Sequence, residues 1–474
     1  MLAAGIVIPV AAAALIALSH RRPNLRETVS LVGAVLTFSA IFHSAADVLQ
    51  GARPRLVLGE MLPGLPLVLE LEPLGLLFAL VASGLWFVSA VYSIGYMRGN
   101  DEKHQTRFYA CFALAIGSAI GVALAGNLLT LYLFYEALTL VTWPLVTHHG
   151  DDAARRGGRT YLGLLLASSL LFLLPAIVAT WWLGGTLDFR PGGILAGRVS
   201  GGAAMGLLAL YAFGIGKAAL MPIHRWLPAA MVAPTPVSAL LHAVAVVKAG
   251  VFSIVKVVVY VFGMDFGAAA FAWLPWVAGF TILAASIVAL RADNLKRRLA
   301  YSTVSQLSYV VLAAAILAPL SMVGAALHIA AHAFGKITLF FAAGAIYTAA
   351  HKTEVSQLDG VGRRMPWTFA AFGIGALSMI GLPPAAGFVS KWYIVSGALA
   401  AEHWLALAVI TASTLLTAGY LLPIVYRGFF READANEHGE APWTMVAALV
   451  TTAALTVAMF FWADLPLAIA RGVG

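Results

Sequence analysis

The sequence predicts an all-α polytopic membrane protein, and two observations carry that prediction. Hydrophobic residues make up 61% of the chain and charged residues only 11%, with a mean hydropathy of +0.90. A soluble domain is typically about 25% charged. The apolar residues also gather in runs that recur along the whole chain. Most of these runs approach the ~20 residues that a helix needs to cross the bilayer core.

The apolar runs predict fourteen transmembrane helices. No long polar segment separates them, so we expect a single membrane domain, residues 1–474. The predicted spans are residues 2–19, 28–46, 74–97, 108–126, 128–147, 160–184, 203–222, 235–262, 270–290, 299–318, 321–349, 367–399, 403–427 and 443–463.

The formal net charge of +8 reflects membrane topology rather than nucleic-acid binding. With alternating spans, the loops of one side carry nineteen Lys and Arg residues and those of the other side carry five. The positive-inside rule places the richer side in the cytoplasm. We therefore expect a bacterial inner-membrane protein with both termini in the periplasm and no nucleic-acid partner.

Two predicted spans, the seventh and the twelfth, contain proline-rich interruptions, at Met221–Pro228 and Gly381–Gly387. Proline removes a backbone donor and clashes with the preceding turn, so each stretch should break its helix. Lys217 is expected just before the first break and Lys391 just after the second. Because the breaks lie five spans apart, they predict two inverted five-helix repeats. These repeats are spans 4–8, residues 108–262, and spans 9–13, residues 270–427. Prolines that only kink a membrane helix are the alternative.

Ionisable side chains inside the apolar runs are the strongest indication of function. A charge at the bilayer centre costs roughly 2.5–3.5 kcal/mol even on a lenient scale. The chain nevertheless places such groups in or beside its spans: Glu136, Lys217, His242, Lys248, Lys256, His328, His332, Lys336 and Lys391. Their presence predicts transport of a proton or another cation across the membrane.

Glu136 is the only acidic residue well inside the first eight predicted spans. We expect it to pair with Lys217, because a carboxylate beside a buried lysine favours the protonated amine. A pair that opens and closes would change the affinity of the lysine for its proton. A structural carboxylate, hydrogen-bonded within the bundle, is the alternative.

His328, His332 and Lys336 recur every four residues and should line one stripe of a helix. Imidazole exchanges protons near neutral pH, so the stripe predicts a proton relay. A zinc site is one alternative. It is disfavoured because residues 329–331 are Ile-Ala-Ala and lack the glutamate of HExxH. Histidines bonded to backbone or water are the other alternative. We expect no metal site.

Lys248 and His242 are expected to continue the relay near the membrane midplane. Lys256 lies about 80° from Lys248 around an ideal helix and is expected to snorkel toward a surface. Cys111 is the only cysteine, which excludes disulfides within the chain. We expect no cofactor, and redox chemistry only in other subunits.

Five stretches resemble the antiporter-like proton-translocating subunits: Phe134-Tyr135-Glu136 and residues 214–252, 293–310, 328–346 and 381–395. That family includes Mrp-type multisubunit Na+/H+ antiporters, the L, M and N membrane subunits of respiratory complex I, and membrane-bound hydrogenase subunits. The resemblance covers roughly residues 70–430. It implies fourteen helices, two inverted repeats, and half-channels joined by a polar axis.

The resemblance also implies roles for particular residues. Glu136 and Lys217 would form the ion pair of the first half, and Lys248 and His242 would continue the axis. His328 and His332 would be the central link, and Lys391 the terminal proton site of the second half. Near Glu136 the chain departs from the family pattern at Thr139, Thr142, Trp143-Pro144 and His148-His149.

Residues 359–368 most resemble the D component of the Mrp antiporters. The expected function is therefore that of a proton-translocating subunit of a Mrp-like monovalent cation/proton antiporter. It would work with other membrane subunits on protons, with Na+ as a candidate second ion. Three alternatives stay open: a proton-pumping subunit of a complex I-like NADH-quinone oxidoreductase, a subunit of a membrane-bound hydrogenase, and the proton-channel partner of an inorganic-carbon uptake system.

Overall fold

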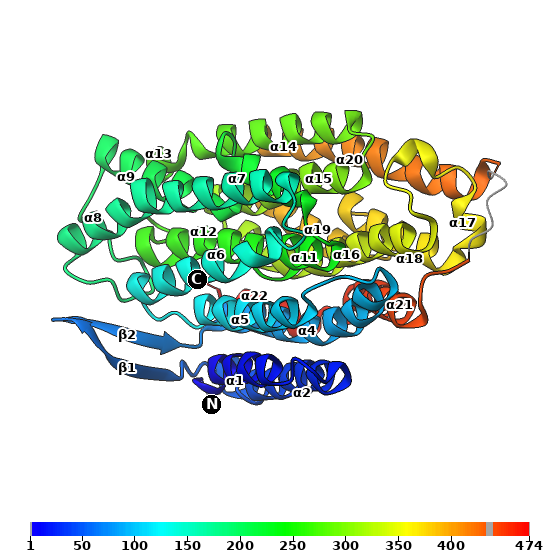
Figure 1. Ribbon diagram of the computed structural model, residues 1–474. Coiled ribbons are helices and arrows are strands. Elements are labelled where there is room, and N and C mark those ends of the chain that lie inside the picture. The colour runs from blue at the N-terminus through cyan, green and yellow to red at the C-terminus, as the bar shows by residue number, and fades with distance from the viewer. Residues whose placement is uncertain (1, 433–438, 474) are drawn as a thin grey trace.

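The computed structural model describes residues 2–432 and 439–473, and its long helices lie side by side in one bundle (Figure 1). The first part of the chain forms α1 (Ala4–Leu18), α2 (Pro23–His43), α3 (Ala45–Leu49), β1 (Arg55–Leu62), β2 (Leu65–Glu70), α4 (Pro73–Gly99), α5 (Gln105–Ala123), α6 (Leu128–Val146), α7 (Asp152–Ser168), the π-helical turn η1 (Ser169–Leu173), α8 (Leu174–Gly184) and α9 (Gly201–Gly214).

The middle of the chain consists of short, irregular helices followed by long ones. They are η2 (Gly216–Ala218), η3 (Ile223–Arg225), α10 (Trp226–Ala229), η4 (Ala230–Val232), α11 (Thr235–Ala239), η5 (Leu240–Val244), α12 (Val246–Lys256), η6 (Val257–Phe262), α13 (Ala268–Phe271), α14 (Leu274–Arg291), α15 (Leu295–Ala315) and α16 (Pro319–Ala350). The last part forms η7 (Val355–Gln357), α17 (Val361–Arg364), α18 (Pro366–Ile380), α19 (Ala386–Ala400), α20 (Trp404–Phe430), α21 (Trp443–Phe461) and α22 (Asp464–Arg471).

The predicted helical membrane fold is confirmed. Every predicted span falls on a helical segment, and within the described residues ten helical stretches are long and apolar enough to cross a membrane. Three further apolar helices, α1, α9 and α18, are shorter. The number of fourteen spans stays a prediction.

A two-stranded hairpin is the element that the prediction lacked. β1 and β2 pair antiparallel, and the hairpin projects beyond α1, α2 and α4 at one end of the bundle (Figure 1). It lies in the polar connection before the third predicted span, where no apolar run marks a structural element.

The alternating topology is consistent with the contacts between loops. On the side that holds most basic residues, hereafter the basic side, Arg427 pairs with Asp359, and Lys296 donates to the carbonyl of Ala233. On the opposite side, Arg55 of the hairpin pairs with Asp188, which precedes α9. Loops that the alternation assigns to one side therefore do contact one another.

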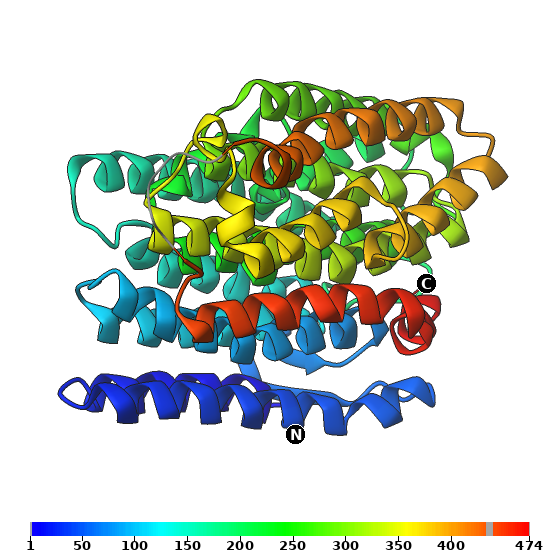
Figure 2. The ribbon, with the colours of Figure 1, turned by 90° about the vertical axis from the view of Figure 1, so that its right-hand side faces the viewer.

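The centre of the bundle consists of two helical stretches, residues 235–262 and α16, and both are almost completely buried. A helix that is apolar all round belongs in such a position. These two stretches carry six of the predicted ionisable residues: His242, Lys248, Lys256, His328, His332 and Lys336. In contrast, α1 and α2 form an outer layer against α4 and α5 (Figure 2).

Both predicted helix breaks are present, and the first comes earlier than expected. α9 ends at Gly214, so Lys217 lies in the turn η2 inside the break rather than before it. The second break separates α18 from α19, and Lys391 lies in the second turn of α19, as expected. Whether residues 108–262 and 270–427 are inverted copies stays a prediction.

Candidate functional site: a buried file of lysines and histidines

Lys217 is held by the main chain and a hydroxyl of α6. Its Nζ donates to the Tyr135 carbonyl at 2.7 Å and to Thr139 Oγ1 at 2.5 Å. The Tyr135 ring centroid is 3.2 Å from the amine, which adds a cation–π contact. The backbone N–H of Lys217 donates to the Tyr135 hydroxyl at 3.0 Å, and the side chain is completely buried.

The predicted ion pair between Glu136 and Lys217 is not formed in this structure. Lys217 instead bonds to neutral acceptors on the neighbouring face of α6. Both carboxylate oxygens of Glu136 are buried, and neither has a hydrogen-bond partner among the described residues. The pair is therefore open in this structure. Because an unpartnered buried carboxylate is costly, Glu136 is expected to bind a proton, a water molecule or the Lys217 amine.

Gly250 of α12 allows the broken segment to reach this position. A Cβ atom on Gly250 would lie 2.3 Å from Ala218 N and 2.3 Å from Lys217 C. Only a residue without a side chain allows η2 to pack directly on α12.

Gly250→Ala is expected to destabilise the protein by about 1–3 kcal/mol, because the new methyl group meets rigid backbone. Gly206→Ala in α9 is the matched control, since nothing lies within 4 Å of its Cβ position. Thermal unfolding of the purified protein in detergent measures both changes. Equal melting temperatures for the two variants would contradict the close packing of η2 on α12.

A chain of contacts runs from Lys248 to the second break. Lys248 Nζ lies 2.5 Å from His332 Nδ1, and the rings of His332 and His328 have centroids 6.0 Å apart. His328 Nδ1 lies 2.9 Å from the hydroxyl of Ser390, the residue before Lys391. All members are buried. We call this set, Lys248–His332–His328–Ser390–Lys391, the central file.

Lys391 occupies the end of α18. Its Nζ donates to the carbonyls of Met379 at 2.9 Å and Ile380 at 3.0 Å. The last carbonyls of a helix lack partners within the helix and carry partial negative charge, so they favour a cation. The Tyr309 ring lies 4.6 Å away. The helix break therefore creates the site that holds the lysine.

The central file does not include every predicted member of the relay. Lys336 points toward α15, where it donates to Ser302 Oγ at 2.6 Å. His242 lies in the π-helical turn η5 with its ring 4.6 Å from that of Phe340. Neither ring nitrogen of His242 has a partner among the described residues. The predicted stripe of His328, His332 and Lys336 thus exists on α16, but its lysine and its histidines face different neighbours.

The prediction for Lys256 is wrong. Its side chain is 1% exposed and does not snorkel; Nζ lies 3.3 Å from Glu72 Oε1 and donates to the Ala125 carbonyl at 2.7 Å. Glu72 also accepts from the backbone N–H groups of Leu74 and Gly75, as an N-cap of α4. Sequence reasoning overlooked Glu72, although an acidic residue followed by proline is a typical helix start.

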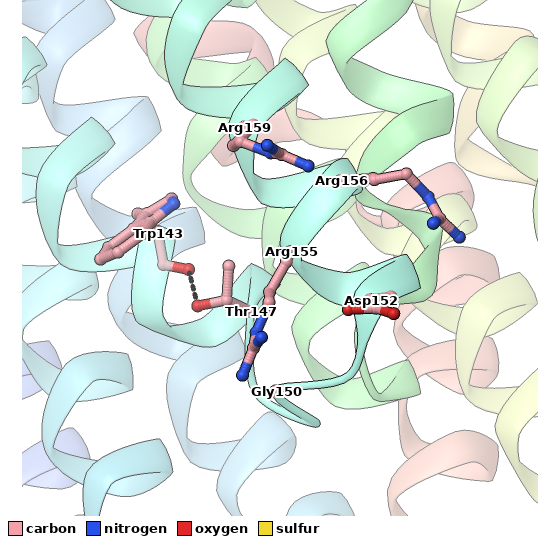
Figure 3. Close-up of a pocket in the computed structure, with 7 residues that line it drawn as sticks. All are labelled: Trp143, Thr147, Gly150, Asp152, Arg155, Arg156 and Arg159. Atoms are coloured by element: carbon pink, nitrogen blue, oxygen red, sulfur yellow. Dashed lines mark hydrogen bonds between the residues drawn. The ribbon is translucent and has the colours of Figure 1, made fainter.

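Another pocket lies outside the buried lysines and histidines. A pocket of about 580 Å³ on the basic side is lined by residues that include Trp143, Asp152, Arg155, Arg156 and Arg159. The three arginine side chains diverge and do not enclose a common point (Figure 3). These arginines fit the role of basic loop residues, which set the orientation of a chain in the membrane. Among the described residues, no three His, Cys, Asp or Glu side chains gather in a way that could hold a metal.

Comparison with known proteins defines the class. Residues 125–417 match the family described as NADH:quinone oxidoreductase/Mrp antiporter, transmembrane region, and the chain belongs to this family. It is 34% identical over 372 residues to NADH-quinone oxidoreductase subunit N of Desulforudis audaxviator, covering 78% of this chain and 73% of that protein. It is 31% identical to hydrogenase-4 component B of Escherichia coli, covering 82% and 62%.

Other relatives are longer than the shared region. The chain is 32% identical to the A/B component of a probable K+/H+ antiporter of Rhizobium meliloti, covering 79% of this chain but only 38% of that protein. Among solved structures, the Mrp complex of a Dietzia species contains a chain with the same fold, at a TM-score of 0.88 and 20% identity, covering 100% of this chain and 96% of that one. A chain of an archaeal membrane-bound sulfane sulfur reductase gives a TM-score of 0.87 at 22% identity, covering 99% and 96%.

Proposed function

We propose that this chain is a proton-translocating subunit of a Mrp-like multisubunit monovalent cation/proton antiporter. The central file is the observation that carries the proposal. It brings amines and imidazoles from the first and second predicted repeats into one buried line, with Lys248 at one end and Lys391 at the other. Buried charges of this kind are retained in a membrane protein when they serve transport.

Each half offers a site where a proton can be held or released. In the first half, Lys217 alternates between the neutral acceptors of α6 and the free carboxylate of Glu136. Moving toward Glu136 favours the charged amine, and moving away favours release of its proton. In the second half, Lys391 rests on the carbonyl end of α18. The histidines between them pass protons because imidazole accepts and donates near neutral pH.

The proposal includes the orientation and the partners. The basic side faces the bacterial cytoplasm, both termini face the periplasm, and the outer helices contact other membrane subunits. Relatives in an antiporter and in a hydrogenase support work within a larger complex. Because these relatives belong to different complexes, the partner subunits would determine which cation is exchanged.

Cation-dependent proton exchange in inverted vesicles tests the proposal, with the chain expressed alongside its neighbouring genes. Addition of Na+ or K+ should collapse a preformed pH gradient. The second candidate function, a proton-pumping subunit of a complex I-like or hydrogenase complex, is favoured by the 34% identity to subunit N. It predicts acidification driven by NADH or hydrogen without any cation requirement, and that result would replace the antiporter proposal.

A further inference from the structure

A second titratable cluster lies on the basic side, outside the central file. It surrounds a cavity of about 240 Å³ that is lined by Glu102, His149, Lys296, Tyr96, Thr235 and Ala343, among others. These residues come from six separate segments: the α4–α5 loop, the α6–α7 loop, and α15, α4, α11 and α16. The cavity thus sits where the first predicted repeat meets α16.

At the mouth of the cavity, the exposed imidazole of His149 contacts the carboxylate of Glu102. His149 Nε2 lies 3.3 Å from Glu102 Oε1, and the His149 side chain is 38% exposed. The hydrogen bond that the His149 ring donates to the Glu102 carboxylate, more than any other cause, raises the pKa of His149 above its usual value near 6.5. His149 is therefore a solvent-accessible imidazole that holds a proton more readily than a free imidazole does.

The other charged groups around His149 have different roles. Lys296 faces it from α15 and opposes its protonation, while its own amine donates to the Ala233 carbonyl. Lys352 lines the same cavity. His148 lies 3.7 Å from the other oxygen of Glu102, but burial lowers its pKa to about 4, so it stays neutral. Arg107 bonds to the His148 carbonyl.

The inner end of the cavity approaches His242. Thr235 lies two turns before His242 on the same helical stretch, and Ala343 lies one turn after Phe340 on α16. The Phe340 ring packs on the His242 ring. Thr235 therefore lies about 10 Å along the helix axis from His242, given a rise of 1.5 Å per residue. The imidazole of His242 has no hydrogen-bond partner among the described residues.

We propose that this cavity is the proton vestibule of His242, and that Glu102 and His149 form its proton-collecting group. The inference rests on the proposed transport function and adds an entry point on the basic side. A proton taken up by His149 Nε2 passes to the Glu102 carboxylate, crosses the cavity on water past the Thr235 hydroxyl, and reaches a free ring nitrogen of His242. Each group returns to its original protonation state as it passes the proton on.

The test is the pH dependence of cation-driven exchange, with the pH varied only on the basic side. A collecting group matters most when protons are scarce. In His149→Gln and Glu102→Gln, the rate at about pH 7.5 should therefore fall by about tenfold. This is the loss expected if the cavity receives protons as slowly as it would at a pH one unit higher. The rate at about pH 6 should stay within about twofold of wild type, because protons then reach the cavity without the group. His20→Gln, an exposed histidine on the same side, is the matched control.

A second variant, at Thr235 in the cavity wall, tests the proposal without changing the two residues at the cavity mouth. Thr235→Val preserves the side-chain volume but removes the hydroxyl, so exchange should slow at every pH. Wild-type pH profiles in both His149→Gln and Glu102→Gln would overturn the vestibule, as would a wild-type rate in Thr235→Val. Absence of exchange in the wild-type complex would instead refute the proposed function, so the two failures are distinguishable.

Discussion

Lys217→Met is expected to abolish cation-dependent proton exchange, with a loss of at least about 100-fold, the scale of a removed proton-transfer group. Methionine fills a similar volume in the turn η2 but has no proton to give. The measurement is the rate of pH-gradient collapse in inverted vesicles. Lys103→Met, an exposed lysine of the α4–α5 loop, is the control and should leave the rate unchanged.

Glu136→Gln should have nearly the same effect as Lys217→Met, for a related reason. The structure shows Lys217 on the neutral acceptors of α6, so Glu136 provides the alternative, charged position. If both residues act as one switch, the double variant should be no worse than either single variant. Native gel electrophoresis should show an assembled complex in each case. Wild-type exchange in both single variants would reject the switch.

Lys391→Met is the other large prediction. Net exchange should again fall by at least about 100-fold, since a proton that reaches His328 has no terminal acceptor. The first half should keep its ability to bind protons, because Lys217 and Lys248 are untouched. A pH jump on the basic side, followed with an indicator dye, should still give a burst of proton uptake. Wild-type flux in Lys391→Met would remove this residue from the path.

Much of the fold can be predicted from patterns in the sequence alone. Apolar runs near 20 residues fix where the helices lie, and proline clusters mark the two breaks. Buried amines and imidazoles stand out because they are expensive in hydrocarbon. These signals identify Lys248, His328, His332 and Lys391 from the sequence. The hairpin β1–β2 gives no comparable signal, because its strands are short and β1 is exposed along its whole length.

The partners of the buried groups depend on packing and could not be predicted. The turn η2 approaches α12 closely at Gly250, and in this arrangement the Lys217 amine contacts Tyr135 and Thr139 rather than Glu136. Lys256 meets Glu72 because the N-terminus of α4 covers it, a contact between residues 184 positions apart. The π-helical turn η5 also shifts His242 relative to an ideal helix, since such a turn holds an extra residue.

Proton flux in proteoliposomes containing His328→Leu tests most directly whether protons pass between the halves through His332 and His328. Leucine interrupts the central file while every lysine and Glu136 remain. Flux should fall to the level of Lys391→Met, and combining the two substitutions should cause no further loss. Full flux with leucine at position 328 would contradict passage through the central file.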